Sequence, residues 1–225
     1  MNLLYDKDMT CPNCKTKFST KKVFSTKLRL LKSDTDQRRV YKNINPYLYE
    51  INVCPSCGYA FGEKANTRLS EQKLGNLIDY FLNIRNLDHF SKERDISEGI
   101  RSFKLALYIS GLIGEPSYVK SALSIKLAWL YRETDNSEME KKYLKVAYTH
   151  YQHAFLNEEY EKAGYKGYFM LYMLCDLARR LDDYESAKRW YSEFFAVKDA
   201  PKAMMNTARD CWVDFKNEKN KVSGF

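Results

Sequence analysis

The chain has few glycines and few histidines, and these shortages exclude several classes of enzyme. It contains 9 Gly and 3 His among 225 residues. No glycine-rich phosphate-binding loop, no serine nucleophile elbow and no HExxH metalloprotease motif is present. A Cys-His or Ser-His-Asp set and carboxylates at metal-binding spacing are also missing from the sequence. We therefore predict that the protein is not an enzyme.

Long apolar runs are missing as well. No stretch approaches the roughly 18 consecutive apolar residues that a membrane-spanning helix requires. The first eight residues, Met1 to Asp8, are too acidic and too poor in apolar residues for a secretory signal peptide. We expect a cytoplasmic protein that makes no contact with a membrane.

Two Cys-Pro-x-Cys motifs are the most specific feature that the sequence does contain. Each motif places two thiols on one tight turn, and two such turns facing each other supply four sulfur ligands at roughly 2.3 Å from a metal ion. In a reducing compartment this paired spacing favours a metal site over disulfides. We predict a closed, structural Zn²⁺ site whose four ligands are Cys11, Cys14, Cys54 and Cys57.

Iron is the main alternative to zinc at these cysteines. Cys-Pro-x-Cys turns resemble those of rubredoxins, in which four sulfurs hold a redox-active iron. Rubredoxins are much smaller and more acidic than this chain. The 39 residues between the two cysteine pairs and the long sequence that follows favour zinc.

The pattern of apolar residues divides the chain into two parts. Residues 1–66 contain strand-like alternation, with one candidate strand at Phe24–Leu31 and a second at Tyr47–Val53, which leads into Cys54. From about Arg68 onward the apolar residues recur at helical spacing, and Gly, Pro, Asn and Asp residues mark the ends of about seven helices. We predict an α+β, mainly α protein with a zinc-ribbon-like module at 1–66 and an all-helical domain at 67–225.

The clearest helix pair spans Leu171 to Pro201 and resembles a tetratricopeptide repeat (TPR). The resemblance rests on small residues at Cys175 and Ala187, an aromatic residue at Tyr191 and a proline near the end. Earlier helices repeat this pattern more loosely, at a longer spacing than the standard repeat. The helical domain is therefore predicted to be an antiparallel, TPR-like array.

Several of these segments together resemble one known family, the bacterial domain-of-unknown-function family 2225. The resemblance covers nearly the whole chain and implies a zinc-ribbon-like start, TPR-like helices and a cytoplasmic location, but no catalytic residues. It rests on the following segments: Tyr5-Asp6-Lys7, CPNC, Phe24–Leu31, Asn45-Pro46-x-x-Tyr49 before CPSCGYA, Leu127–Arg132 and the terminal repeat.

The remaining histidines and cysteines are weaker candidates. His150 and His153 lie three residues apart on one expected helix and could present two imidazoles to one ligand, although such pairs are more often surface residues. His89 is expected in a loop or helix cap. Cys175 and Cys211 are expected to pack as small apolar groups.

The formal charge of +8 is concentrated in the first part of the chain. Residues 1–66 carry twelve Lys or Arg and six Asp or Glu, and four thiolates with one divalent ion would lower their charge to near +4. Basic residues at 15–42, interleaved with Phe18, Phe24 and Tyr41, could form a nucleic-acid-binding face or simply a solvated strand face. The basic residues are Lys15, Lys17, Lys21, Lys22, Lys27, Arg29, Arg38 and Arg39.

These observations favour a zinc-binding cytoplasmic adaptor that binds a protein or peptide partner through its TPR-like helices. The alternative is a nucleic-acid-associated regulatory protein that uses the basic zinc-ribbon module. The sequence indicates no oligomeric state.

Overall fold

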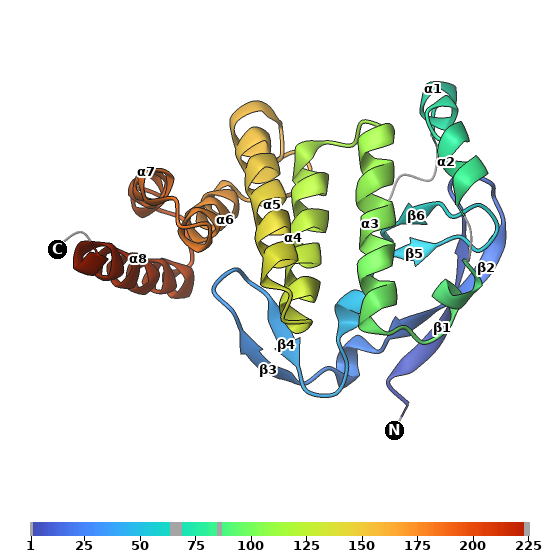
Figure 1. The fold of residues 1–225 in the computed structure, drawn as a ribbon, viewed down its shortest axis with the longest axis horizontal. Coiled ribbons are helices and arrows are strands. Elements are labelled where there is room, and N and C mark those ends of the chain that lie inside the picture. The colour runs from blue at the N-terminus through green and yellow to red at the C-terminus, as the bar shows by residue number, and fades with distance from the viewer. Residues whose placement is uncertain (1, 64–68, 85–86, 223–225) are drawn as a thin grey trace.

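The structure, a computed structural model, describes residues 2–63, 69–84 and 87–222. Its β elements lie at the N-terminal end and its helices follow in a row, as Figure 1 shows. The fold is mainly α with a β-rich start, as predicted. In chain order the elements are β1 (Leu4–Thr10), β2 (Lys17–Val23), the 3₁₀ helix η1 (Ser25–Lys27), β3 (Leu30–Ser33), β4 (Arg39–Tyr41), η2 (Pro46–Tyr49), β5 (Asn52–Val53), β6 (Ala60–Phe61), α1 (Glu71–Gly75), α2 (Ile78–Asn83), η3 (Asp88–Ser91), α3 (Ile96–Leu112), α4 (Ser117–Glu133), α5 (Ser137–Asn157), α6 (Gly167–Arg180), α7 (Tyr184–Phe195) and α8 (Lys202–Val222).

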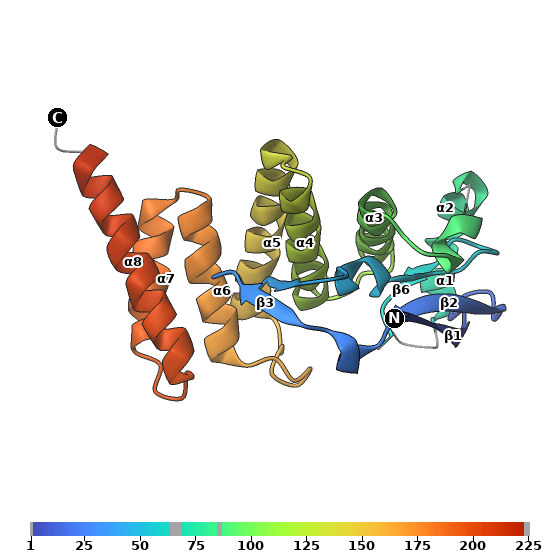
Figure 2. The ribbon, with the colours of Figure 1, turned by 90° about the horizontal axis from the view of Figure 1, so that it is seen from below.

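The strands form three separate antiparallel pairs, β1–β2, β3–β4 and β5–β6. The residue pair Thr10 and Lys17 ends the first pair at one cysteine motif, and Val53 and Ala60 end the third pair at the other. Each Cys-Pro-x-Cys motif is therefore the turn of a hairpin. The middle pair, β3–β4, runs beneath the helices from the β-rich end toward α6 (Figure 2).

The candidate strand at Phe24–Leu31 is wrong for most of its length. Ser25–Lys27 forms the 3₁₀ helix η1, and the strands lie on either side of it, in β2 and β3. The Phe24 ring packs on the Tyr5 ring, with 4.6 Å between centroids, and Leu30 remains 55% exposed. The alternation in this segment therefore does not mark one buried face.

The second candidate strand, Tyr47–Val53, is only partly confirmed. Its first half belongs to the 3₁₀ helix η2, because Pro46 suits the first helical turn and the Asn45 side chain accepts a hydrogen bond of 2.9 Å from the Tyr47 N–H. Tyr47 and Tyr49 are both buried in this helix, which explains their strand-like spacing.

The long helices begin where local capping chemistry is strongest. Asp95 and Glu98 form a reciprocal capping box at the start of α3, with two hydrogen bonds of 2.8 Å. Pro116 precedes α4, and the Asn136 and Asp183 side chains cap α5 and α7. The helix boundaries that the sequence predicts at Pro116, Asn136 and Asp183 are confirmed, whereas the Asp95–Glu98 box was not predicted. Gly99 lets α3 approach η2, since a Cβ there would lie 2.4 Å from the Leu48 side chain.

One continuous hydrophobic core runs from the cysteine motifs to α8. The predicted boundary between residues 66 and 67 lies outside the described residues, and independent folding of the two parts stays a prediction. The contacts that cross this boundary are nevertheless specific. The tip of the β3–β4 hairpin contacts α4 and α6, and Arg94, just before α3, bonds to the backbone around η2.

Candidate metal centre

The two Cys-Pro-x-Cys motifs fold into equivalent turns, which we call knuckle 1 (residues 11–16) and knuckle 2 (residues 54–59). In knuckle 1 the Cys11 N–H donates to the Thr16 carbonyl at 3.0 Å, and the Lys15 N–H donates to the Cys11 carbonyl at 3.1 Å. In knuckle 2 the corresponding distances, from Cys54 to Tyr59 and from Gly58 to Cys54, are 3.0 and 2.8 Å. Both turns therefore present their cysteines in the same backbone frame.

The residue after the second cysteine adopts a left-handed conformation in both knuckles. Gly58 has φ 76° and Lys15 has φ 63°. Glycine adopts this region freely, whereas a residue with a Cβ is strained there. Knuckle 1 therefore carries backbone strain that knuckle 2 does not.

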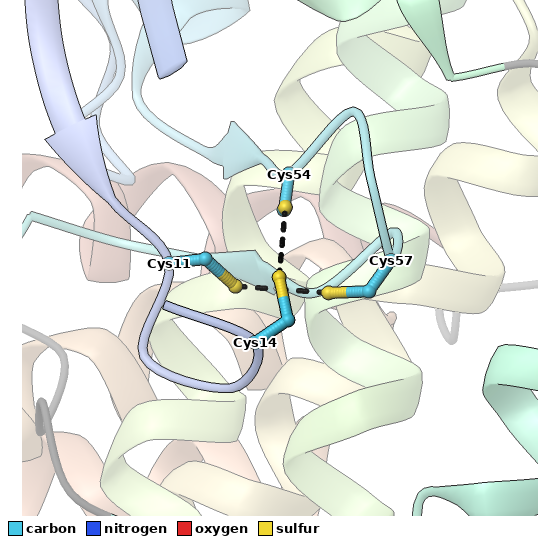
Figure 3. Close-up of side chains that lie close together, drawn as sticks. All are labelled: Cys11, Cys14, Cys54 and Cys57. Carbon is cyan, nitrogen blue, oxygen red and sulfur yellow. Dashed lines mark hydrogen bonds between the residues drawn. The ribbon is translucent and has the colours of Figure 1, made fainter. Parts of the chain in front are cut away.

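The four thiols converge on one point, as Figure 3 shows. The sulfurs of Cys11 and Cys57 lie 3.6 Å apart, as do those of Cys14 and Cys54, and all four sulfurs lie within 4.8 Å of one another. A disulfide requires about 2.05 Å, so these are free thiols. A tetrahedral ion with metal–sulfur bonds of about 2.3 Å separates its ligand sulfurs by about 3.8 Å. The donor set and its spacing therefore fit a four-thiolate metal ion.

The knuckles differ in how deeply they are buried. Cys11 and Cys54 are 0% exposed, Cys57 is half-buried and Cys14 is exposed. The Asn13 side-chain amide donates to the Cys57 sulfur at 3.4 Å, and such a hydrogen bond stabilises a metal-bound thiolate. Cys14 is thus the most exposed of the four thiols, and Cys11 and Cys54 are fully covered.

Without a cation, four clustered thiols cannot all ionise. Hydrogen bonds with Cys54 and Cys57, together with burial, raise the pKa of Cys11. Hydrogen bonds from Cys11 and Cys54 instead lower the pKa of Cys57. A divalent ion would remove this conflict, because it stabilises all four thiolates.

His150 and His153, which were weaker candidates for a shared ligand, belong to no metal-binding group among the described residues, where the four cysteines are the group that could hold an ion. His153 Nδ1 lies 3.1 Å from Ser117 Oγ and 3.4 Å from Glu158 Oε1. Burial lowers the pKa of His150. His89 lies in the short helix η3 with its ring against Phe90.

The Ser117, His153 and Glu158 side chains resemble a catalytic triad by composition but not by geometry. In a triad, serine and acid contact opposite nitrogens of the imidazole. Here both contact Nδ1. Glu158 also accepts hydrogen bonds from the backbone N–H groups of Ser117 and Tyr118, at 2.8 and 3.2 Å. Glu158 is therefore a cap for the start of α4.

The two remaining cysteines lie in the C-terminal helices. Cys175 is 0% exposed in α6, and burial raises the pKa of its thiol. Cys211 is half-buried in α8, and burial raises its pKa too. Cys175 packs as a small apolar group, as expected.

The predicted basic face is divided by the fold. Lys22 is buried, with its ammonium 2.7 Å from the Tyr49 carbonyl and 3.4 Å from Glu63. Arg38 is also buried and pairs with Glu133 at 2.9 Å. These two cations therefore hold the fold together and cannot belong to an exposed nucleic-acid-binding face. Lys15, Lys17, Arg29 and Arg39 remain exposed on different elements.

A second candidate site is a groove of about 940 Å³, which we call the α3–α4 groove. One wall consists of apolar residues on α3 and α4, and the other consists of residues from the β-rich part, including β6. The Glu50–Lys126 ion pair lies at its lining. The apolar and aromatic lining includes Phe103, Ile109, Tyr118, Val119, Leu123, Tyr5, Val23, Leu28, Tyr49, Ile51, Tyr59 and Phe61.

The family described as "Uncharacterized protein conserved in bacteria" (DUF2225) matches residues 4–215. The chain belongs to this family. A protein of Borreliella burgdorferi with the name "Uncharacterized protein" is 27% identical over 157 residues, which are 59% of this chain and 54% of that protein. The chain thus spans about half the length of that relative. No solved structure matches this chain.

Two features of this DUF2225 chain were not predicted from its sequence. The first is Arg94, a buried cation that bonds to backbone carbonyls of η2 and η3. The second is the α3–α4 groove, whose walls come from segments far apart in the chain. A buried arginine carries no local sequence signal, and the apolar groove residues look like ordinary core residues.

No helix in the described part of the chain combines the length and apolar character needed to cross a membrane.

Proposed function

We propose that this protein is a cytoplasmic adaptor that binds an apolar segment of a protein partner in the α3–α4 groove. In this proposal a structural zinc ion at Cys11, Cys14, Cys54 and Cys57 stabilises the wall of the groove that faces α3 and α4. Zinc would hold the two knuckles together and would supply no reaction chemistry there.

The observation that carries the proposal is the direct connection between the cysteines and the groove. Tyr59, Ala60 and Phe61 begin two residues after Cys57 and line the groove. Their positions are set by knuckle 2 and by the pairing of β6 with β5. A metal ion that fixes the knuckle therefore also fixes this wall.

The groove suits a peptide in size and chemistry. Its volume of about 940 Å³ lies at the upper end of the range for small-molecule sites. Its lining is rich in aliphatic and aromatic residues, and these are the residues that bind apolar anchors of partner proteins. The helices α5 to α8, including the TPR-like pair α6–α7, would serve as the scaffold that supports α4.

Two further parts of the proposal rest on the thiols and on the Ser117–His153–Glu158 cluster. Free thiols persist in a reducing compartment, which supports a cytoplasmic location. We also propose that the protein is not an enzyme. In support, the Ser, His and Glu side chains that meet at α4 lack the geometry of a triad.

The first test is metal content. Elemental analysis of protein purified without added metal is expected to give one zinc per chain. One iron per chain, with the absorption spectrum of an iron–thiolate centre, would contradict the adaptor proposal and indicate a redox protein.

The second test addresses the groove. Peptides are selected from a display library on the zinc-loaded full chain, and their affinities are measured by fluorescence anisotropy. Val119→Asp and Leu123→Asp, both in the groove, are expected to weaken binding at least about tenfold. Val213→Asp, at an exposed site on α8, is the matched control and is expected to leave affinity unchanged.

The same assay distinguishes the nucleic-acid alternative. Binding in an apolar groove is expected to vary little with salt, because few ions are released. A protein that reads phosphates would instead prefer an oligonucleotide probe and would weaken steeply as salt rises. That outcome would contradict the adaptor proposal.

A further inference from the structure

Among the described residues, the four cysteines differ in their access to solvent: Cys14 is exposed, Cys57 is half-buried, and Cys11 and Cys54 are buried. Knuckle 2 is covered at Gly58, where Tyr80 donates a hydrogen bond of 2.7 Å to the Gly58 carbonyl and the Ile84 and Leu87 side chains lie against Gly58. Knuckle 1 is open, because Cys14 and Lys15 are both exposed. A soluble reagent would therefore meet the sulfur of Cys14 first.

The exposed sulfur also has a suitable partner. Cys14 Sγ lies 3.6 Å from Cys54 Sγ, which is fully buried and belongs to the other knuckle. A disulfide needs these sulfurs to approach to about 2.05 Å, and knuckle 1 has the exposure and the strained Lys15 backbone that such a shift requires. Cys14 is thus placed to be oxidised, and Cys54 is placed to resolve the product.

We propose that Cys14 is an oxidation site at which a peroxide triggers release of the metal, through a disulfide between Cys14 and Cys54. This inference rests on the metal site of the proposed function. It assigns that site a sensitivity to a chemical class of oxidant, the hydroperoxides, and it identifies which thiol reacts.

The chemistry balances with hydrogen peroxide as the oxidant. The Cys14 thiolate attacks one peroxide oxygen, so that an S–O bond forms, the O–O bond breaks and hydroxide leaves. The Cys54 thiolate then attacks the sulfur of this sulfenic acid, so that the S–S bond forms and a second hydroxide leaves. Two thiolates are oxidised by two electrons in total and one peroxide is reduced. Cys11 and Cys57 remain, and two thiolates do not complete a tetrahedral site.

The new disulfide would connect the same two knuckles that the metal connects. The hairpins β1–β2 and β5–β6 would therefore stay joined after the metal leaves. We expect the oxidised chain to remain folded and to recover its metal when a thiol reductant and zinc are supplied together.

The experiment uses the full chain in its metal-loaded form. Metal content is measured first, then hydrogen peroxide is added in substoichiometric steps while a chromogenic chelator reports free zinc. Trypsin places Cys11 and Cys14 in the peptide 8–15 and Cys54 and Cys57 in the peptide 43–64. The expected product is a crosslink between these peptides, with fragment ions that assign it to Cys14 and Cys54, and about one zinc released per disulfide.

Variants separate Cys14 from the other thiols. Cys14→Ser is expected to slow peroxide-driven release at least tenfold, whereas Cys211→Ser, which removes a half-buried thiol outside the cluster, is expected to leave the rate unchanged. If Cys14→Ser does not hold metal, labelling of the unaltered chain with a sulfenic-acid probe decides the matter, and Cys14 is expected to be labelled first.

The outcomes distinguish the two proposals. Absence of metal from the purified protein would overturn the proposed metal site itself. A metal-loaded protein in which Cys14 stays reduced while zinc leaves, or in which Cys11 and Cys14 crosslink within peptide 8–15, would overturn only the inference about Cys14 and Cys54.

Discussion

Asp36 and Arg132 are 96 positions apart in the chain and form an ion pair with 2.6 Å between Oδ2 and Nη2. Asp36 lies at the tip of the β3–β4 hairpin and is 0% exposed, and Trp129 Nε1 donates a second hydrogen bond to it at 3.0 Å. The neighbouring Thr35 carbonyl accepts a hydrogen bond of 2.6 Å from the Tyr172 hydroxyl. The hairpin that connects the two knuckles is thereby fixed to both α4 and α6.

The first prediction concerns this contact. Asp36→Asn keeps the size of the side chain but removes the fully buried carboxylate of the pair, and loss of one member of a buried pair destabilises by about 3–5 kcal/mol. Arg132 keeps Asp34 at 3.0 Å and Glu140 at 2.7 Å, which favours the lower end of that range. We expect a fall of about 3 kcal/mol in the free energy of unfolding, measured by urea denaturation. Asp210→Asn, at an exposed position on α8, is the control and should change stability by less than about 0.5 kcal/mol.

The contribution of Asp36 should also depend on pH. Burial alone would raise the pKa of Asp36, but the hydrogen bond from Arg132 and the charges of Arg180 and Arg132 outweigh it, so the folded-state pKa lies below the ordinary value. A depressed pKa stabilises the fold above the unfolded-state value of about 3.9 and loses that contribution as the pH falls below it. The stability difference between the unaltered chain and Asp36→Asn should therefore be constant above about pH 5 and shrink below about pH 4. A difference that grows on acidification would contradict this assignment.

The sequence predicts those parts of the structure that depend on neighbours along the chain. Cys-Pro-x-Cys spacing determines the knuckles, and residues such as Pro116, Asn136 and Asp183 determine where helices begin, because capping uses groups within a few positions. The segment Phe24–Leu31 was misjudged as one strand because its burial depends on partners that are distant in the chain. Asp36 and Arg38 look like ordinary hairpin charges in the sequence, and only the fold brings them to Arg132 and Glu133.

The second prediction concerns Arg94, which is 6% exposed. Its burial lowers the pKa of the guanidinium to about 10. Its guanidinium donates to the carbonyls of Leu48, Ile51 and Phe90 at distances from 2.6 to 3.0 Å. A lysine cannot reach all three acceptors, because its donors lie on one nitrogen. We expect Arg94→Lys to destabilise the protein by about 2–3 kcal/mol.

Arg209→Lys, on the exposed side of α8, is the matched control for this substitution. It should leave the urea midpoint nearly unchanged. An equal effect of both variants would show that the bonds of Arg94 to η2 and η3 contribute little.

The third prediction compares the two knuckles. Gly58→Ala places a Cβ at a residue with φ 76° and 3.0 Å from the Ile84 side chain. We therefore expect the free energy of unfolding of the metal-loaded protein to fall by more than about 1 kcal/mol. Lys15→Gly removes a Cβ from φ 63° and should instead stabilise by about 0.5 kcal/mol. Thermal unfolding of the zinc-loaded variants measures both effects.

Lys17→Gly provides the sign control, since Lys17 is exposed and lies in the extended strand β2. Glycine lowers stability in a strand, so this change should act in the direction opposite to Lys15→Gly. A loss of stability in both lysine variants would mean that strain at Lys15 is negligible.

The last prediction concerns metal removal and the two parts of the chain. Chelation would remove the metal ion proposed at the four cysteines, and Cys14→Ser or Cys57→Ser is expected to have the same effect. The hairpins β1–β2 and β5–β6 should then lose their protection from amide hydrogen exchange. Circular dichroism should retain most of its helical signal, because α4 packs on α5 and α5 packs on α6. The helices should nevertheless unfold at a lower temperature, since Asp36 and Arg94 then no longer connect them to an ordered module. Complete loss of the helical signal on chelation would show that the chain folds as one unit. An unchanged melting temperature of the helices would show that the contacts of Asp36 and Arg94 do not transmit stability between the two parts.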